Sequence, residues 1–277
     1  MLGQLQKSFM VTVQDTQTYV MDDGEGVPTL FLHGIPDSAD MWRSVVKEMR
    51  GTVRAITPDL PGFGRSVVPT SYYMPSLEGM ASWVNALLDA LAIDEPVNLV
   101  TTDLGGTFGI AFAVKYPQRV RRLALVGATN FFPAYRWHQM AKILRTPVVG
   151  EVALSMMNYN MFKKSVVDVN HHDPFFTDDI LRPSYEMGLA KPSVRTNMLR
   201  YYRMLDPKHF AAWQEGLKAF TANVPMLILW GDQDPYIEPH FAERYGAQEV
   251  HHFPEYGHWI AMQAPQMVAE HLKRFFA

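Results

Sequence analysis

The sequence predicts an α/β fold in which a mostly parallel, doubly wound sheet carries an inserted helical segment. Three observations point to this fold class. Several short, almost uninterrupted apolar runs end at Gly, Pro or Asp, as buried parallel strands do. Segments with apolar residues spaced three and four apart lie between several of these runs, as amphipathic helices do. One long stretch, 129–222, has helical spacing but contains no convincing strand.

The apolar runs are expected to form five strands of the sheet. In chain order these runs are PTLFLHG (28–34), VRAITPDL (53–60), VNLVTTD (97–103), RLALVGA (122–128) and PMLILWGDQD (225–234). Helices are expected at 76–93 and at 106–120, where the helical pattern continues up to Pro117. Strands that alternate with helices are typical of an α/β fold with helices on both faces of the sheet.

The stretch 129–222, rich in Met, Tyr, Phe and His, is expected to form a helical cap. The core would then consist of residues 1–128 and 223–277. Because the cap follows the strand at 122–128, it would lie above the carboxyl ends of the strands, where open α/β sheets bind their ligands. The alternative is a helical elaboration that only covers apolar surface.

Composition excludes several classes of function. A net charge of −3 and the lack of any Lys/Arg cluster leave no basic footprint for nucleic acid, so a small neutral substrate is favoured. The absence of cysteine excludes disulfides, thiolate metal sites and cysteine nucleophiles. Adjacent histidines occur as pairs, but no third ligand stands at a suitable spacing, so neither a metal nor another cofactor is expected.

The beginning of the chain and its apolar runs bear on its location. The start MLGQLQKSFMVTVQD lacks the apolar run of a signal peptide. No apolar stretch approaches the ~20 residues that a membrane span needs. We therefore expect a cytoplasmic protein without a membrane partner, and the sequence indicates no oligomeric state.

The segment VTTDLGGTFG (100–109) has the pattern of a strand that turns sharply into a helix, with Asp103 at the apex. A nucleophile elbow needs small residues two positions before and two after the nucleophile, because the turn is strained and crowded. Thr101 and Gly105 occupy those positions, and Gly106 adds clearance. The bare pattern also fits an ordinary turn aspartate, so the rest of the chain has to decide.

The order of the other candidate residues favours the elbow, since a nucleophile, an acid and a histidine are expected in that order. Asp234 ends the last predicted strand, and His258 lies in a loop before an amphipathic terminal helix. Asp232 is the rival acid, but a position so near the strand more often serves the turn. His33 is expected to brace its own loop through a hydrogen bond rather than to take part in chemistry.

The loop after the first predicted strand, HGIPDS (33–38), supplies the last part of the expected site. The backbone N–H groups of Ile35 and Leu104 are candidates for an oxyanion hole, since both could point at an oxygen that gains charge. The peptide bond before Pro36 could be cis or trans on sequence grounds.

Together, His33-Gly34-Ile35-Pro36, PDLPGFGRS (58–66), Asp103, Asp234 and GHW (257–259) resemble the α/β-hydrolases of the epoxide hydrolase and dehalogenase group. The resemblance covers nearly the whole chain and is weakest in the cap. It implies an α/β-hydrolase fold in which the Asp103 carboxylate attacks an sp3 carbon and forms an alkyl-enzyme ester. A water molecule activated by His258, with Asp234 as its acid partner, would then hydrolyse that ester and regenerate Asp103.

Two substrate classes stay open within this resemblance. Haloalkane dehalogenases usually carry Trp after the nucleophile and often Asn in the HGxP loop, and these donors hold the leaving halide. Here Leu104 and Ile35 stand at those positions, so Trp137 or another cap donor would have to hold the halide. Fluoroacetate dehalogenases commonly carry Arg after the nucleophile to bind the substrate carboxylate. In this chain Leu104 stands at that position.

Epoxide hydrolases instead use cap tyrosines to protonate the oxygen of the opening ring. The segment NMLRYYRML (197–205) resembles the cap segment that carries one of them and indicates Tyr202, with Tyr159 or Tyr135 as the second. A tyrosine, with an ordinary pKa near ~10, is a suitable acid for an alkoxide leaving group. The alternative is that these tyrosines only line an apolar cap.

The expected function is therefore hydrolysis of an epoxide to a diol. Dehalogenation of a haloalkane or haloacid is the first alternative. A non-catalytic receptor for a small ligand is the alternative of another class, because a fold does not fix a function. The expected partners are a small apolar substrate and water.

Overall fold

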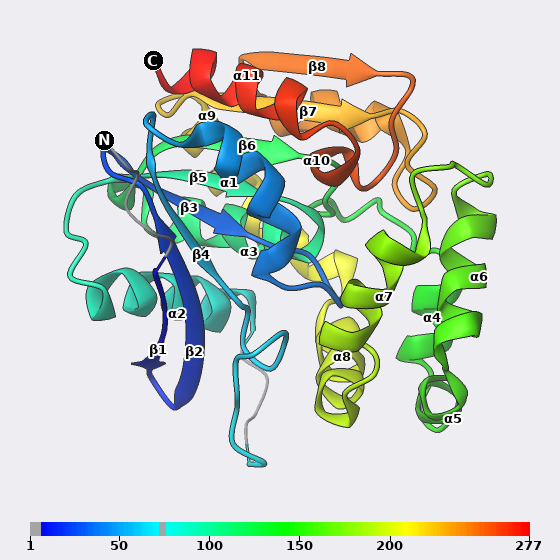
Figure 1. Ribbon diagram of the computed structural model, residues 1–277. Coiled ribbons are helices and arrows are strands. Elements are labelled where there is room, and N and C mark those ends of the chain that lie inside the picture. The colour runs from blue at the N-terminus through cyan, green and yellow to red at the C-terminus, as the bar shows by residue number, and fades with distance from the viewer. Residues whose placement is uncertain (1–6, 72–75) are drawn as a thin grey trace.

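An eight-stranded sheet runs through the middle of the molecule (Figure 1). The computed structural model describes residues 7–71 and 76–277. The strands lie in the order β1-β2-β4-β3-β5-β6-β7-β8. Their bounds are β1 Lys7–Val13, β2 Thr16–Asp23, β3 Pro28–Leu32, β4 Arg54–Pro58, β5 Val97–Thr101, β6 Val120–Val126, β7 Met226–Gly231 and β8 Glu249–Phe253.

The sheet is mostly parallel, as predicted. Each neighbouring pair from β4 through β3, β5, β6 and β7 to β8 is parallel, while β1 and β2 add an antiparallel edge. All five strands expected from the apolar runs are present. β1, β2 and β8 were not predicted, because their side chains are largely exposed or alternate between the interior and the solvent.

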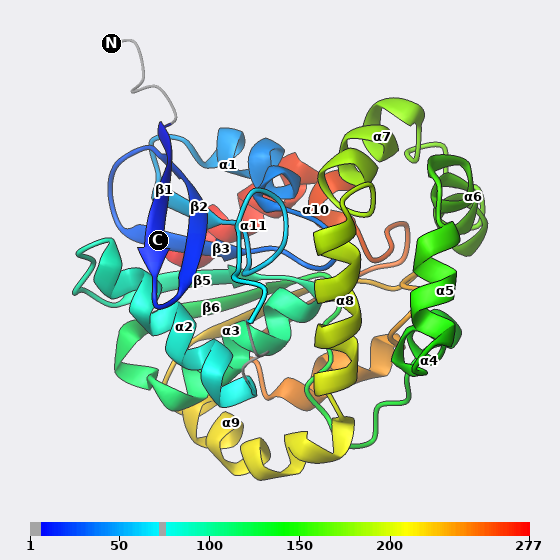
Figure 2. The ribbon, with the colours of Figure 1, turned by 90° about the horizontal axis from the view of Figure 1, so that it is seen from below.

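Helices cover both faces of the sheet (Figures 1 and 2). On one face α1 packs against α11, and on the other α3 packs against both α2 and α9. Since successive strand residues point to opposite faces, Leu99 of β5 joins the core beneath α2 and α3, whereas Val100 joins the core beneath α1 and α11. The core helices are α1 Arg43–Met49, α2 Leu77–Ala90, α3 Asp103–Lys115, α9 Gln214–Thr221, α10 Ile260–Gln263 and α11 Pro265–Phe276.

Five helices between β6 and β7 stand at one end of the sheet, beside the core (Figure 2). They are α4 Gln139–Arg145, α5 Val149–Met156, α6 Tyr159–Val169, α7 Asp178–Met187 and α8 Pro192–Met204. The next helix, α9, packs on α3 in the core. This contact favours a cap that ends before η3 (Pro207–Trp213), and the division into 129–222 and the rest stays a prediction.

Three further 3-10 helices complete the chain: η1 Ala39–Trp42, η2 Pro117–Arg119 and η4 Pro239–Tyr245. Within the two described ranges, none of the helices combines the length and the apolar character needed to cross a bilayer.

Candidate active site

Asp103 stands at the sharp turn between β5 and α3, as the sequence predicts. It is the first residue of α3, and its φ of 46° lies in the left-handed region that residues with a side chain rarely adopt. Its backbone N–H donates to the carbonyl oxygen of Ala128 at 3.0 Å, which ties the turn to the end of the neighbouring strand. The strained backbone presents the carboxyl group above the carboxyl ends of the strands.

Two glycines make room for this turn. A Cβ on Gly105 would stand 2.2 Å from the carbonyl oxygen of His33, and a Cβ on Gly34 would stand 2.5 Å from the Cβ of Asp103. Both distances are too short for any side chain. The loop after β3 can therefore approach the start of α3 closely only because these two positions are glycine.

Backbone donors hold the Asp103 carboxyl group. The N–H of Ile35 donates to Oδ1 at 2.9 Å, and the N–H of Leu104 also donates to this carboxyl group. Burial would raise the pKa of Asp103, but His258 and these two N–H groups outweigh burial and lower the pKa below its ordinary value. Asp103 is therefore ionised at neutral pH. The peptide bond between Ile35 and Pro36 is cis.

His258 links Asp103 to Asp234. Its Nε2 lies 3.4 Å from Oδ2 of Asp103, and its Nδ1 lies 2.5 Å from Oδ2 of Asp234. The other oxygen of Asp234 accepts from the backbone N–H groups of Tyr236 and Ile237, which fixes the carboxylate. Burial lowers the pKa of His258, but the charges of Asp234 and Asp103 outweigh burial and raise the pKa to about 10.

The two alternatives weighed for nearby residues are resolved by contacts. Asp232 does not contact His258 but pairs with His252, at 2.5 Å from its Nδ1. His33 braces its loop, as predicted, because its Nε2 accepts from the N–H of Leu60 at 2.8 Å while its Nδ1 lies 2.6 Å from the carbonyl oxygen of Gly34.

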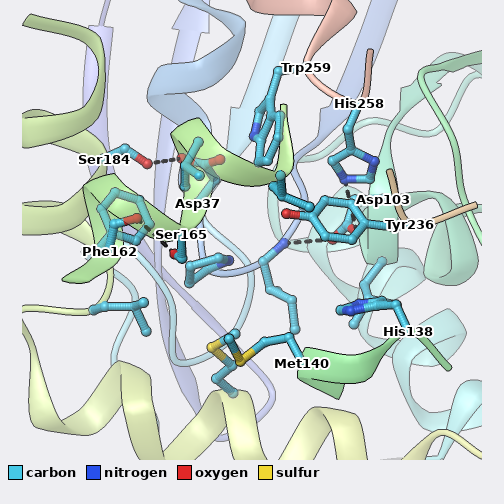
Figure 3. A pocket seen from close by; sticks show the side chains of 18 of the residues that line it. Asp37, Asp103, His138, Met140, Phe162, Ser165, Ser184, Tyr236, His258 and Trp259 are labelled. Atoms are coloured by element: carbon cyan, nitrogen blue, oxygen red, sulfur yellow. Dashed lines mark hydrogen bonds and ion pairs between the residues drawn. The ribbon is translucent and has the colours of Figure 1, made fainter. Parts of the chain in front are cut away.

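A cavity of about 220 Å³ lies between the cap and the core, and Asp103 and His258 face it (Figure 3). Most of its wall is apolar, and the cap helices contribute Leu154 of α5, Phe162 of α6 and Met198 of α8 among others. Such a wall favours a small, mainly apolar ligand with few polar groups.

Tyr202, Tyr135 and Trp137 all line this cavity. Burial is the main cause that raises the pKa of Tyr202 well above its ordinary value, and the charge of Asp103 adds to it. Tyr202 and Tyr135 therefore keep their hydroxyl protons at neutral pH, since burial and Asp103 raise the pKa of Tyr135 too. Among the described atoms, the indole Nε1 of Trp137 is buried without a hydrogen-bond partner.

Tyr159 does not line the cavity, which corrects its expected place in the site. It lies in the first turn of α6, where its hydroxyl donates to Asp178 and its ring packs against Tyr185 and beneath the guanidinium of Arg182. These contacts turn the side chain toward the outside of the cap. Tyr135 is therefore the second tyrosine that the sequence named and the structure brings to the cavity.

Sequence reasoning missed three titratable residues of the cavity wall, Tyr236, His138 and Asp37. The ring of Tyr236 meets that of His258 edge-on at 5.0 Å between centroids. Burial and the positive charge of His258 lower the pKa of His138 to about 4, so His138 is neutral at pH 7. The only sequence signal was position, since Tyr236 follows Asp234 by two residues and Asp37 follows the cis proline directly.

The described residues offer no cluster of three or more His, Cys, Asp or Glu side chains that could hold a metal ion.

Comparisons with known proteins agree with this geometry. The profile of a family described as alpha/beta hydrolase fold matches residues 27–148. A haloalkane dehalogenase of Mesorhizobium japonicum is 30% identical to the chain over 87% of it and 80% of the relative. Epoxide hydrolase 3 of Xenopus tropicalis is 27% identical over 89% of the chain and 70% of the relative. A cis-3-alkyl-4-alkyloxetan-2-one decarboxylase of Shewanella oneidensis is 27% identical over 97% and 88%.

The fold has close counterparts among solved structures. The crystal structure of Cfl2 from Burkholderia cenocepacia superposes with a TM-score of 0.84 and covers 98% of this chain and 96% of that one. At 22% sequence identity, this likeness concerns the fold.

Proposed function

Since the chain belongs to the α/β-hydrolase family and is a hydrolase of the epoxide hydrolase and haloalkane dehalogenase type, we propose that it hydrolyses a small epoxide to a diol through an ester on Asp103. The observation that carries this proposal is that the two oxygens of the Asp103 carboxyl group have different contacts. Oδ1 is held by the N–H of Ile35, while Oδ2 lies toward His258. Oδ2 is thus the oxygen available for attack.

In the first step Oδ2 of Asp103 attacks a ring carbon of the epoxide, and the bond from that carbon to the ring oxygen breaks. The products of this step are a hydroxyalkyl ester on Asp103 and an alkoxide that takes a proton from a tyrosine. Tyr202 and Tyr135 are the proposed proton donors, because both tyrosines line the cavity together with Asp103. Their raised pKa values keep the proton in place until the alkoxide, a stronger base, forms.

His258 carries a proton at neutral pH in the free enzyme, and it first gives this proton to the tyrosinate that the first step leaves. In the second step the neutral His258 takes a proton from water, and the resulting hydroxide attacks the ester carbonyl carbon of Asp103. The former Oδ1 becomes the oxyanion, and the N–H groups of Ile35 and Leu104 stabilise it. Collapse of this intermediate releases the diol and regenerates the carboxylate. His258 keeps the proton that it took from water, which restores the imidazolium of the free enzyme, so the whole cycle consumes only epoxide and water.

The charge balance of the site supports this order of events. Asp103 loses its negative charge when it becomes an ester, so one of the two causes that raise the pKa of His258 disappears. His258 is therefore a better base in the ester than in the free enzyme. Asp234 remains ionised, holds Nδ1 of His258 and stabilises the imidazolium that forms.

Dehalogenation is the second candidate, favoured by the haloalkane dehalogenase relative and by Trp137. Trp137 lines the cavity, and its indole N–H is buried without a partner among the described residues, so a change of rotamer would offer this N–H to a halide. The same Asp103 ester would form, with halide in place of the alkoxide. A strained oxetanone, the substrate class named for the Shewanella oneidensis relative, is a third class to test.

The test is a panel of terminal epoxides, haloalkanes, haloacids and a cis-3,4-dialkyloxetan-2-one, scored for diol, halide and alkene. We expect diol from epoxides, with kcat/KM at least about 10³-fold lower in Asp103→Ala. Asp232→Asn is the matched control, because this carboxylate pairs with His252 instead of His258, and it should keep full activity. Halide release without diol would favour dehalogenation over epoxide hydrolysis. Turnover retained in Asp103→Ala would refute the role of Asp103 as the nucleophile.

A further inference from the structure

The proposed reaction leaves one carboxyl group of the cavity without a task, that of Asp37. It follows the cis proline on the loop after β3 and lines the cavity. Figure 3 shows Asp37 and Ser184 on one side of the cavity, and His258, Tyr236 and His138 on the other. Asp37 and Ser184 therefore form a second polar region of the cavity, on the side opposite His258, Tyr236 and His138.

Asp37 has unused capacity to accept hydrogen bonds. Its Oδ1 accepts from the hydroxyl of Ser184 of α7 at 2.8 Å, whereas an ionised carboxylate offers about four acceptor positions. The charged groups that act on this carboxyl are His33, Asp103 and His258, and no lysine or arginine of the described chain is among them. Burial raises the pKa of Asp37 above its ordinary value, because the hydrogen bond from Ser184 and the charges of His33 and His258 offset only part of its effect.

Asp37 lies on the wall of a second cavity as well. A neighbouring cavity of about 340 Å³ shares Asp37, Ser184, Met41 and Ile180 with the first. Because Asp103 and Asp37 line the same first cavity, a substrate whose reacting carbon lies at Asp103 has room for a chain that reaches Asp37.

We propose that Asp37 is a specificity-determining residue that binds a hydrogen-bond donor, a hydroxyl or ammonium group, on the part of the substrate distant from the reacting carbon. Ser184 orients the carboxyl group through its hydrogen bond. A buried polar group without enough partners carries a free-energy cost, which a donor from the substrate relieves. The inference rests on the proposed function and names its substrate class: aliphatic epoxides with a hydroxyl or amine at the far end.

The test compares three terminal epoxides of equal chain length that end in methyl, hydroxyl or ammonium. For the wild type we expect kcat/KM for the hydroxyl and ammonium substrates to exceed that for the methyl substrate by roughly tenfold or more. Asp37→Leu removes the acceptor at similar volume. It should abolish this preference by raising KM for the hydroxyl and ammonium substrates. Asp37→Asn keeps an acceptor but no charge, so it should retain part of the hydroxyl preference and lose the ammonium preference.

The matched control is Asp179→Asn, which removes a carboxylate from the wall of the neighbouring cavity but not from the first. It should leave the ratio of polar to methyl substrates unchanged. Equal losses for all three substrates in Asp37→Leu would mean a structural role and overturn the proposal. A wild-type ratio near one would also overturn it, and this measurement needs no variant to fold.

A binding measurement separates this inference from the proposed function. Calorimetry with Asp103→Ala, alone and combined with Asp37→Leu, gives Kd for the same three epoxides without turnover. Preferred binding of the polar epoxides that depends on Asp37 supports the subsite even if the wild type forms no diol. Diol formation without any such preference would support the proposed function and overturn the subsite.

Discussion

Replacing Asp103 by Asn should lower the pKa of His258, because the ionised carboxylate favours the imidazolium form. Nε2 of His258 lies 3.4 Å from Oδ2 of Asp103. At this separation Coulomb's law gives about 1 kcal/mol in bulk water and about 5 kcal/mol at an effective dielectric constant of ~20. Since one pKa unit corresponds to about 1.4 kcal/mol, the pKa should fall by about 1 to 3.5 units.

The assay is a titration of the histidine side chains by heteronuclear NMR, with the signal of His258 assigned by its absence in His258→Gln. The starting pKa is about 10 in the wild type. Asp232→Asn is the control, because its carboxylate contacts His252 and should leave His258 unchanged. A change below about half a unit in Asp103→Asn, or an upward change, would refute the electrostatic coupling on which the mechanism depends.

Three further predictions follow from the same contacts. Tyr202→Phe should lower kcat for epoxides by about 10²-fold or more while Tyr159→Phe, outside the cavity, leaves kcat unchanged, as steady-state kinetics can check. His258 has a raised pKa of about 10 in the folded state, so the native protein binds more protons than the unfolded chain between pH ~6.5 and about 10. The free energy of unfolding should therefore fall as the pH rises through this range, and it should fall less in His258→Gln. Gly105→Ala should destabilise the fold by about 1–3 kcal/mol in urea titrations, since the added Cβ would stand 2.2 Å from a carbonyl oxygen of His33.

Each of these predictions has an outcome that contradicts it. An equal loss of kcat in Tyr202→Phe and Tyr159→Phe would exclude Tyr202 as the proton donor. The same pH dependence in wild type and His258→Gln would mean that another group titrates. Stability of Gly105→Ala within about 0.5 kcal/mol of the wild type would mean that the turn has more room than described.

The strands of the core were predictable because they are buried on both faces and read as short apolar runs. β3, β5 and β7 are buried throughout, and all three were expected within a few residues of their bounds. β8 was missed because it is an edge strand with exposed and half-exposed side chains. The helix after β5 starts at Asp103 instead of residue 106, because an elbow turns directly into its helix.

The residues near Asp103 were predictable from the order and spacing of the motifs, because turns at the ends of strands have fixed requirements. The cavity wall in the cap was less so. Tyr159 and Tyr135 could not be separated by spacing, since the direction of each side chain depends on how the cap helices pack on the core. Asp37 was not singled out, because its place in the cavity depends on a hydrogen bond between the cap and the core. Ser184 of α7 donates this bond to Asp37 in the loop after β3.

The most direct measurement of the central claim is the mass of the peptide that contains Asp103 after His258→Gln has been incubated with an epoxide that the wild type hydrolyses. Without the histidine, attack on the epoxide continues but hydrolysis of the ester stops. We predict a mass increase on this peptide equal to one substrate molecule. An unmodified peptide, or an adduct on another residue, would contradict the account.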